Sequence, residues 1–154
     1  MAEKIGIRPA TITIYGDKIL LVRSQYNGEE FFLFPGGGLE FGETLEEGAI
    51  RETVEETGIK VKIKELVHIN EYIYKEDWNK RSITAFFLTK CAEEDEINPQ
   101  TTDGGKIKEA VWVEIKKLEE LDIRPKILIK GIKNYFEKGK FLIPSYSIDY
   151  KNEK

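Results

Sequence analysis

The stretch that most constrains this chain runs from Gly37 to Ile59 and reads GGLEFGETLEEGAIRETVEETGI. A helix is expected to begin after Thr44, because Thr44 and Glu47 have the spacing of a capping box, in which each side chain accepts a hydrogen bond from the other residue's backbone N–H. Gly58 is expected to end the helix, since glycine readily adopts the left-handed conformation of a C-terminal cap. The sequence therefore predicts one helix between two defined caps.

Three carboxylates share one face of this predicted helix. On a wheel of 3.6 residues per turn, Glu55 lies about 60° to one side of Glu52, and Glu56 lies about 40° to the other. Like charges at these spacings destabilise an isolated helix by about 0.2–0.5 kcal/mol per pair, so a bound cation would relieve the repulsion. Carboxylate oxygens favour Mg²⁺ or Mn²⁺ over zinc or copper. A solvated acidic face without metal is the alternative that the helix alone leaves open.

A neighbouring arc of the same helix is expected to face the core. It consists of Ala49, Ile50, Thr53, Val54 and Thr57.

The spacing of the whole stretch resembles the Nudix box, whose pattern is Gly-x5-Glu-x7-Arg-Glu-U-x-Glu-Glu-x-Gly-U, where U is a bulky aliphatic residue. This chain matches every fixed identity, with Gly37, Glu43, Arg51, Glu52, Glu55, Glu56 and Gly58. One U position departs from the pattern, because it holds Thr53. That residue lies on the arc expected to face the core, so the departure concerns local packing and not the acidic face. Pro35 and Gly36, just before the box, also resemble the family.

The resemblance implies hydrolysis of a nucleoside diphosphate linked to another group, such as a nucleotide sugar, ADP-ribose or a nucleoside triphosphate. Divalent metal, Mg²⁺ or Mn²⁺, would neutralise charge that develops on the phosphates and lower the pKa of a bound water. Glu43 and Arg51 are expected to form an ion pair that holds the loop against the helix. The implied metal ligands are Glu52, Glu55, Glu56 and a backbone carbonyl, that of Gly36.

The general base is open between Glu52, which is the first candidate, and two acids outside the box, Asp103 and Glu109. Other residues outside the box are candidate substrate contacts, with surface ion pairs and core packing as the alternatives. Arginines that could bind phosphates are Arg23 and Arg81, with Arg8 as a third, and aromatic residues that could stack on a base are Tyr72, Tyr74 and Trp78.

The order of expected elements describes an α/β fold, and the resemblance implies the Nudix-type α/β/α sandwich around a mixed sheet. Strands are expected at 8–15, 18–24, 31–34, 59–73, 81–89 and 109–114, and helices at 44–57, 115–121 and 125–136. The chain is expected to form a single domain, 1–154, with a core over about 8–136. The C-terminal extension, 137–154, is expected to end in an extended tail from Phe141.

The 154 residues carry a net charge of −4, which disfavours binding to long nucleic acid and favours a small nucleotide-type substrate. No apolar run is long enough for a membrane helix, and the N-terminus has no signal-peptide pattern, so a cytoplasmic location is expected. Cys91 and His68, each the sole residue of its type, are expected to be packing residues. The sequence leaves open whether the chain forms a homodimer.

A second function class is a non-catalytic Nudix-like module that binds a nucleotide or ADP-ribose. Such a sensor does not need the full set of acidic residues, and here Glu52, Glu55 and Glu56 are all present. The intact acidic face therefore favours the enzyme.

Overall fold

The computed structural model describes residues 4–74, 80–93, 99 and 109–151. The described residues form strands and helices in this order: β1 (Lys4–Tyr15), β2 (Lys18–Tyr26), β3 (Glu29–Leu33), α1 (Leu45–Thr57), β4 (Val61–Tyr74), β5 (Lys80–Cys91), β6 (Glu109–Glu114), the 3-10 helix η1 (Ile115–Glu120), β7 (Ile123–Arg124), α2 (Leu128–Lys138) and β8 (Tyr146–Lys151).

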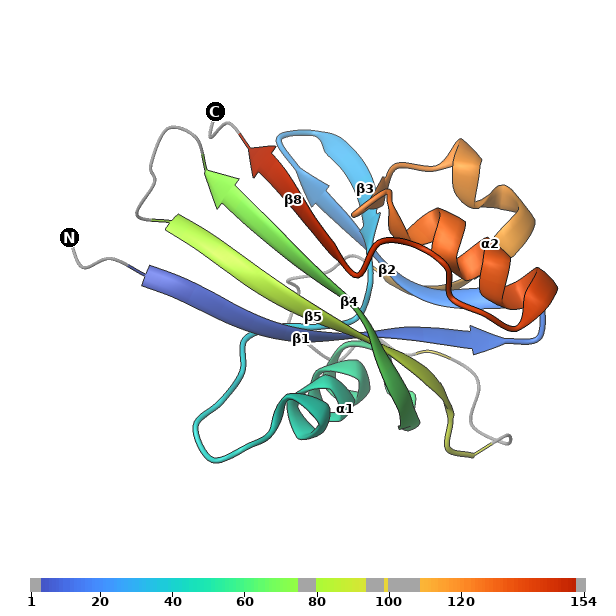
Figure 1. Cartoon of the computed structure of the whole chain (residues 1–154), viewed down its shortest axis with the longest axis horizontal. Coiled ribbons are helices and arrows are strands. Elements are labelled where there is room, and N and C mark those ends of the chain that lie inside the picture. Colours follow the sequence, from blue (N-terminus) through green and yellow to red (C-terminus); the bar gives the residue numbers. More distant parts are fainter. Residues whose placement is uncertain (1–3, 75–79, 94–98, 100–108, 152–154) are drawn as a thin grey trace.

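The strands form one strongly curled mixed sheet. Its larger part has the order β1, β5, β4, β8, in which β1 and β5 are parallel, β5 and β4 are antiparallel, and β4 and β8 are parallel. A hairpin joins β1 to β2, which pairs with β3 and β6, and β3 in turn pairs with β7. Figure 1 shows α1 and α2 on opposite sides of β1, β4 and β5. The predicted α/β sandwich around a mixed sheet is confirmed.

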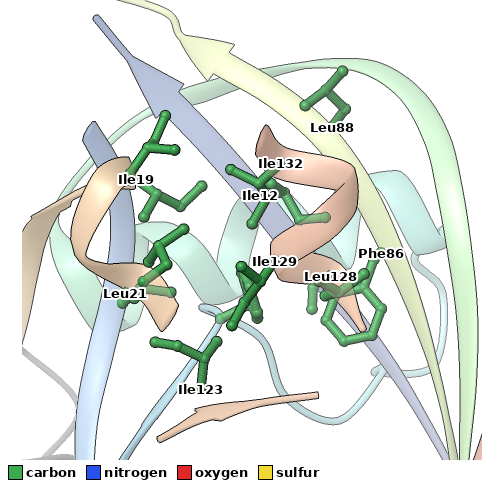
Figure 2. Close-up of a cluster of buried hydrophobic side chains, with 13 residues drawn as sticks. Ile12, Ile19, Leu21, Phe86, Leu88, Ile123, Leu128, Ile129 and Ile132 are labelled. Atoms are coloured by element: carbon green, nitrogen blue, oxygen red, sulfur yellow. The ribbon is translucent and has the colours of Figure 1, made fainter. Parts of the chain in front are cut away.

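The main hydrophobic core lies on the α2 side of the sheet. Apolar residues of β1, β2 and β5 alternate with residues of the opposite face, so each strand supplies every second side chain to this core. Figure 2 shows Ile12, Ile19, Leu21, Phe86 and Leu88 gathered around Leu128, Ile129 and Ile132 of α2, with Ile123 beside them. This core joins β1, β2 and β5 to α2 and so holds the two parts of the sheet together.

Helix α1 packs on the other face of the sheet through hydroxyl groups as well as apolar side chains. The Thr53 hydroxyl donates to the carbonyl of Ala49 at 2.8 Å, so its oxygen is left to accept a hydrogen bond from the Thr11 hydroxyl at 2.7 Å. Both side chains are fully buried. The threonine at the aliphatic position of the box is therefore matched by a second threonine on β1, which explains how a polar residue is tolerated there.

The prediction that the chain after Phe141 is a simple extended tail is wrong. Residues Tyr146–Lys151 form β8, which pairs with β4 from Ile69 to Tyr74 and lies at the edge of the sheet. A strand of six residues next to a 14-residue strand gains its hydrogen bonds from that partner, so no local periodicity was required for it to form. The sheet therefore includes a strand from the C-terminal extension, beyond the core expected over about 8–136.

We expect Thr53→Val to lower the free energy of unfolding by about 1–3 kcal/mol, because the buried Thr11 hydroxyl would lose its acceptor. Adding Thr11→Val should recover most of that loss, since neither hydroxyl then remains unsatisfied. Urea denaturation of both single variants and the double variant measures this coupling. Strictly additive losses would contradict the pairing of Thr11 with Thr53.

Candidate active site

Helix α1 begins and ends as the sequence predicts. The backbone N–H of Glu47 donates to the Thr44 hydroxyl at 3.1 Å, and the N–H of Thr44 donates to the Glu47 carboxylate at 3.0 Å. Gly58 has a φ of 75° and donates to the carbonyl of Val54 at 2.8 Å. These caps fix the rotation of the helix relative to the preceding loop, so its acidic residues face residues 36–43.

Arg51 is the central charged group of the site. Its Nε and one Nη donate to the two carboxylate oxygens of Glu43, at 3.0 and 2.7 Å, and the same Nη also donates to the carbonyl of Gly38 at 3.0 Å. Hydrogen bonds from Arg51 and from the backbone of Glu40 lower the pKa of Glu43 to about 2. The structure thus contains the ion pair expected between Glu43 and Arg51, and it ties the loop to the helix.

The other Nη of Arg51 contacts two of the predicted metal ligands. It donates to the carboxylate of Glu52 at 2.8 Å and to that of Glu55 at 3.2 Å. The carboxylates of Glu43 and Glu52 raise the pKa of Arg51, so the guanidinium is permanently charged. Repulsion between neighbouring glutamates on α1 is therefore partly relieved by an arginine of the same helix.

Two glycines allow the loop to approach these acids closely. A Cβ added to Gly37 would lie 2.5 Å from the carboxylate of Glu52, and a Cβ on Gly36 would lie 2.7 Å from the side chain of Ala10. The backbone N–H of Gly36 donates to Glu56 at 2.6 Å, and Glu56 is only 8% exposed. Glycine is needed here because there is no space for a side chain between the loop, β1 and α1.

The three predicted ligands of α1 are engaged in two directions. Glu52 and Glu55 point to Arg51, whereas Glu56 points to the amide of Gly36. Within the described part of the chain, no three His, Cys, Asp or Glu side chains are grouped so that they could hold a metal. The three carboxylates do not converge on one point. Arg51 binds Glu52 and Glu55, and the amide of Gly36 binds Glu56. The donor set itself, hard carboxylate oxygens beside a glycine loop, suits Mg²⁺ or Mn²⁺.

The candidate residues outside the box lie in two places. Arg23 on β2 pairs with Glu109 on β6, which are register partners, and the buried Nε of Arg23 has no hydrogen-bond partner among the described residues. Arg81 on β5 donates to Glu71 at 3.2 Å, on the same face of the sheet as α1. The structure thus brings Arg23 and Glu109 together and leaves Arg81 in a separate pair.

Three further candidates lie outside the box: Asp103 is a candidate general base, and Trp78 and Tyr72 are candidates for stacking on a nucleobase. Asp103 and Trp78 lie outside the described residues. Tyr72 lines a pocket with Arg124 and Asp149. Arg124 and Asp149 were not identified from the sequence, because they lie on β7 and β8, at opposite ends of the strand order, and only the curled sheet places both in one pocket.

Comparisons with known proteins agree with this fold and loop. Residues 7–132 match the family model for the NUDIX domain. This chain belongs to the Nudix family. It is 31% identical over 115 residues to a protein named ADP-ribose pyrophosphatase from Methanocaldococcus jannaschii, a match that covers 74% of this chain and 64% of that protein. It is also similar to an RNA pyrophosphohydrolase from Wolbachia pipientis, at 29% identity over 64% of this chain and 68% of the relative.

A solved structure supports the same fold. The NUDIX hydrolase from Nitrosomonas europaea superposes with a TM-score of 0.70 over 91% of this Nudix chain and 94% of that protein, at 21% identity. Several curated relatives are longer than the matched region, since the match spans 64% of the ADP-ribose pyrophosphatase and 41% of an NAD-capped RNA hydrolase from Chromobacterium violaceum. The family prediction is confirmed, and the names of the relatives support the prediction of a Nudix pyrophosphohydrolase.

We expect Arg51→Ala to lower both stability and activity, because Glu43 would lose its bidentate partner and Gly38 its side-chain donor. The melting temperature should fall by at least about 4 °C, and Arg51→Lys should recover little of it, since a lysine cannot make the same forked contact. Circular-dichroism melts beside an activity assay measure both effects. Parental stability with lost turnover would instead assign Arg51 to a direct phosphate contact.

Proposed function

We propose that this protein hydrolyses a pyrophosphate bond in a nucleoside diphosphate linked to another group, with Mg²⁺ or Mn²⁺ as cofactor. The observation that carries the proposal is the arrangement of the Nudix box, in which the glycine loop contacts Glu52 and Glu56 directly. A glycine loop whose backbone lies directly beside several carboxylates suits the joint binding of metal and phosphate. The names of the relatives are consistent with this reaction class.

In this proposal Glu52, Glu55, Glu56 and the carbonyl of Gly36 hold the divalent metal. The metal would supply charge neutralisation for the phosphates and a lower pKa for water bound to it. Arg51 then acts as a positioning residue, because it holds Glu52 at 2.8 Å and the loop carbonyl of Gly38 at 3.0 Å. The chain itself thus supplies a fixed frame into which the phosphates fit.

Glu52 remains the first candidate for the general base, with Asp103 as an alternative. Glu109 is less suited to that role, because its carboxylate already accepts a hydrogen bond from Arg23. We propose that Arg23 contributes to substrate binding, since its buried Nε can still donate one hydrogen bond. Arg81 is the weaker candidate for that role because Glu71 already accepts from it.

The direct test is a panel of nucleotide sugars, ADP-ribose, dinucleoside polyphosphates and nucleoside triphosphates, incubated with Mg²⁺ or Mn²⁺ and analysed by product mass. Metal-dependent cleavage between two phosphates supports the proposal. Binding of ADP-ribose or a nucleotide without cleavage of any compound would instead support the alternative, a non-catalytic binding module.

No described helix is long and apolar enough to cross a membrane. A cytoplasmic location and a single domain over residues 1–154 stay predictions of the sequence, which leaves a homodimer open.

We expect Glu56→Gln to keep the fold and lower kcat/KM by at least about tenfold on a substrate from the panel. Glutamine retains an oxygen that can accept from the Gly36 amide, so the loop contact survives while the charge is lost. Glu46→Gln, an exposed change in the first turn of the same helix, is the matched control. Steady-state rates across a metal titration measure the effect, and near-parental turnover at every metal concentration would remove Glu56 from the active site.

We also expect millimolar Mg²⁺ or Mn²⁺ to raise the melting temperature by about 3 °C or more, because a ligand that binds only the folded state stabilises it. The shift should vanish in Glu55→Gln/Glu56→Gln, which lacks two of the proposed ligands. Differential scanning fluorimetry with and without EDTA measures it. An unchanged melting temperature in the parent protein would count against a metal site on α1.

A further inference from the structure

A pocket of about 390 Å³ lies where the two ends of the curled sheet come together. Strand β7 and the residues that follow it form one side, and β4 and β8 form the other, with Tyr72, Asp122, Arg124 and Asp149 in its walls. The match to the NUDIX family model ends at residue 132, before β8 begins at Tyr146. One wall of the pocket therefore comes from a segment that the family match does not include.

Strand β8 is held in place by buried hydrogen bonds to β4. His68, which is 1% exposed, has Nδ1 2.8 Å from the carbonyl of Pro144, so this nitrogen carries the hydrogen. Burial lowers the pKa of His68, and its Nε2 lies 2.7 Å from the Ser147 hydroxyl. The Ser147 oxygen also lies 2.5 Å from the side chain of Asn70. Asp149, two residues further along the strand, points to the same face as Ser147, so this network positions its carboxylate.

Asp149 differs from the other acids of the pocket. Asp122 accepts two hydrogen bonds from Arg124, at 3.2 and 2.9 Å, and Glu119 pairs with Lys133 at 2.9 Å. Within the described part of the chain, Asp149 makes no hydrogen bond or ion pair with another side chain. Its register partner is Tyr72, whose pKa is raised by burial and by the Asp149 carboxylate, so the phenol stays protonated. Asp149 is thus a hydrogen-bond acceptor available to a ligand.

The lining of the pocket favours a group rich in hydroxyls. A terminal phosphate would meet three carboxylates, those of Glu119, Asp122 and Asp149, against the cations of Arg124 and Lys126. A nucleobase would need an open aromatic face on the side of the pocket where Asp149 lies, but Tyr72 is half-buried there. Tyr150 is 52% exposed, but it follows Asp149 on β8 and so points to the other face of that strand. A carboxylate with two oxygens can accept from two neighbouring hydroxyls at once, as a sugar ring presents them.

We propose that this pocket binds the sugar that is linked to the distal phosphate of the substrate, with Asp149 accepting hydrogen bonds from two vicinal hydroxyls. The proposal rests on the pyrophosphohydrolase function and narrows its substrate class to nucleoside diphosphate sugars in preference to nucleoside triphosphates. It also gives β8 a role in specificity, because Asp149 is supplied by that strand.

The test compares Asp149→Asn with the parent protein on ADP-ribose, UDP-glucose and ATP. For the sugar substrate that the parent cleaves best, KM should rise about tenfold while kcat stays within twofold, because a charged acceptor of two hydroxyls is lost and no residue of the Nudix box is changed. Hydrolysis of ATP should be unchanged. Ile148→Thr is the matched control, since Ile148 lies on the same strand, is 39% exposed and faces away from the pocket. Equal losses on the sugar substrate and on ATP, or no loss on either, would overturn the proposal.

Calorimetric binding of the same compounds in EDTA separates this inference from the function on which it rests. A sugar nucleotide that binds the parent protein about tenfold more tightly than Asp149→Asn, without being cleaved when metal is added, would support the pocket and overturn the hydrolase. Cleavage of ATP alone, with no binding of either sugar nucleotide, would overturn the pocket and leave the hydrolase standing.

Discussion

The site depends on the bidentate contact between Arg51 and Glu43. Through this one side chain, the helix holds the carboxylate of Glu43, the carbonyl of Gly38 and the carboxylate of Glu52 in a fixed arrangement. Arg51 also lies 3.2 Å from Glu55 and 3.6 Å from Glu40, so a single positive charge lies close to four glutamates. The cluster therefore keeps a negative excess close to the loop, which is the condition under which a divalent cation adds favourable charge.

The loop needs glycine at positions 36 and 37 because its backbone passes close to β1 and α1, and not because of unusual backbone angles. Gly16, Gly28, Gly42, Gly58 and Gly139 have positive φ, whereas Gly36 and Gly37 are not among the described glycines that do. At Gly36 and Gly37 the constraint is space, because an added Cβ would meet Ala10 and Glu52 at under 3 Å. Substrate phosphates and the acids of α1 can thus share a narrow gap, since no side chain of the loop stands between them.

Local signals explain how much of this arrangement the sequence could predict. Thr44, Glu47 and Gly58 act within one or two turns of α1, so the caps and the helix between them follow from spacing alone. The partner of Thr53 could not be predicted in this way, because Thr11 lies 42 residues earlier and meets it only when α1 packs on β1. The same holds for β8, whose anchors His68 and Asn70 lie 79 and 77 residues from Ser147. What the spacing could not show was how α1's acids divide between Arg51 and the loop.

The box and the rest of the chain carry different kinds of information. Proteins named ADP-ribose pyrophosphatase, RNA pyrophosphohydrolase and NAD-capped RNA hydrolase all match this chain, so features shared with all of them cannot specify one substrate. Chemistry that is common to diphosphates requires only metal ligands and a loop for phosphate, the roles proposed above for α1 and residues 36–38. Selection of the group attached to the diphosphate must come from side chains beyond that frame. Asp149 meets this condition, because a strand outside the family match places its carboxylate in the pocket lined by residues of β7 and β8.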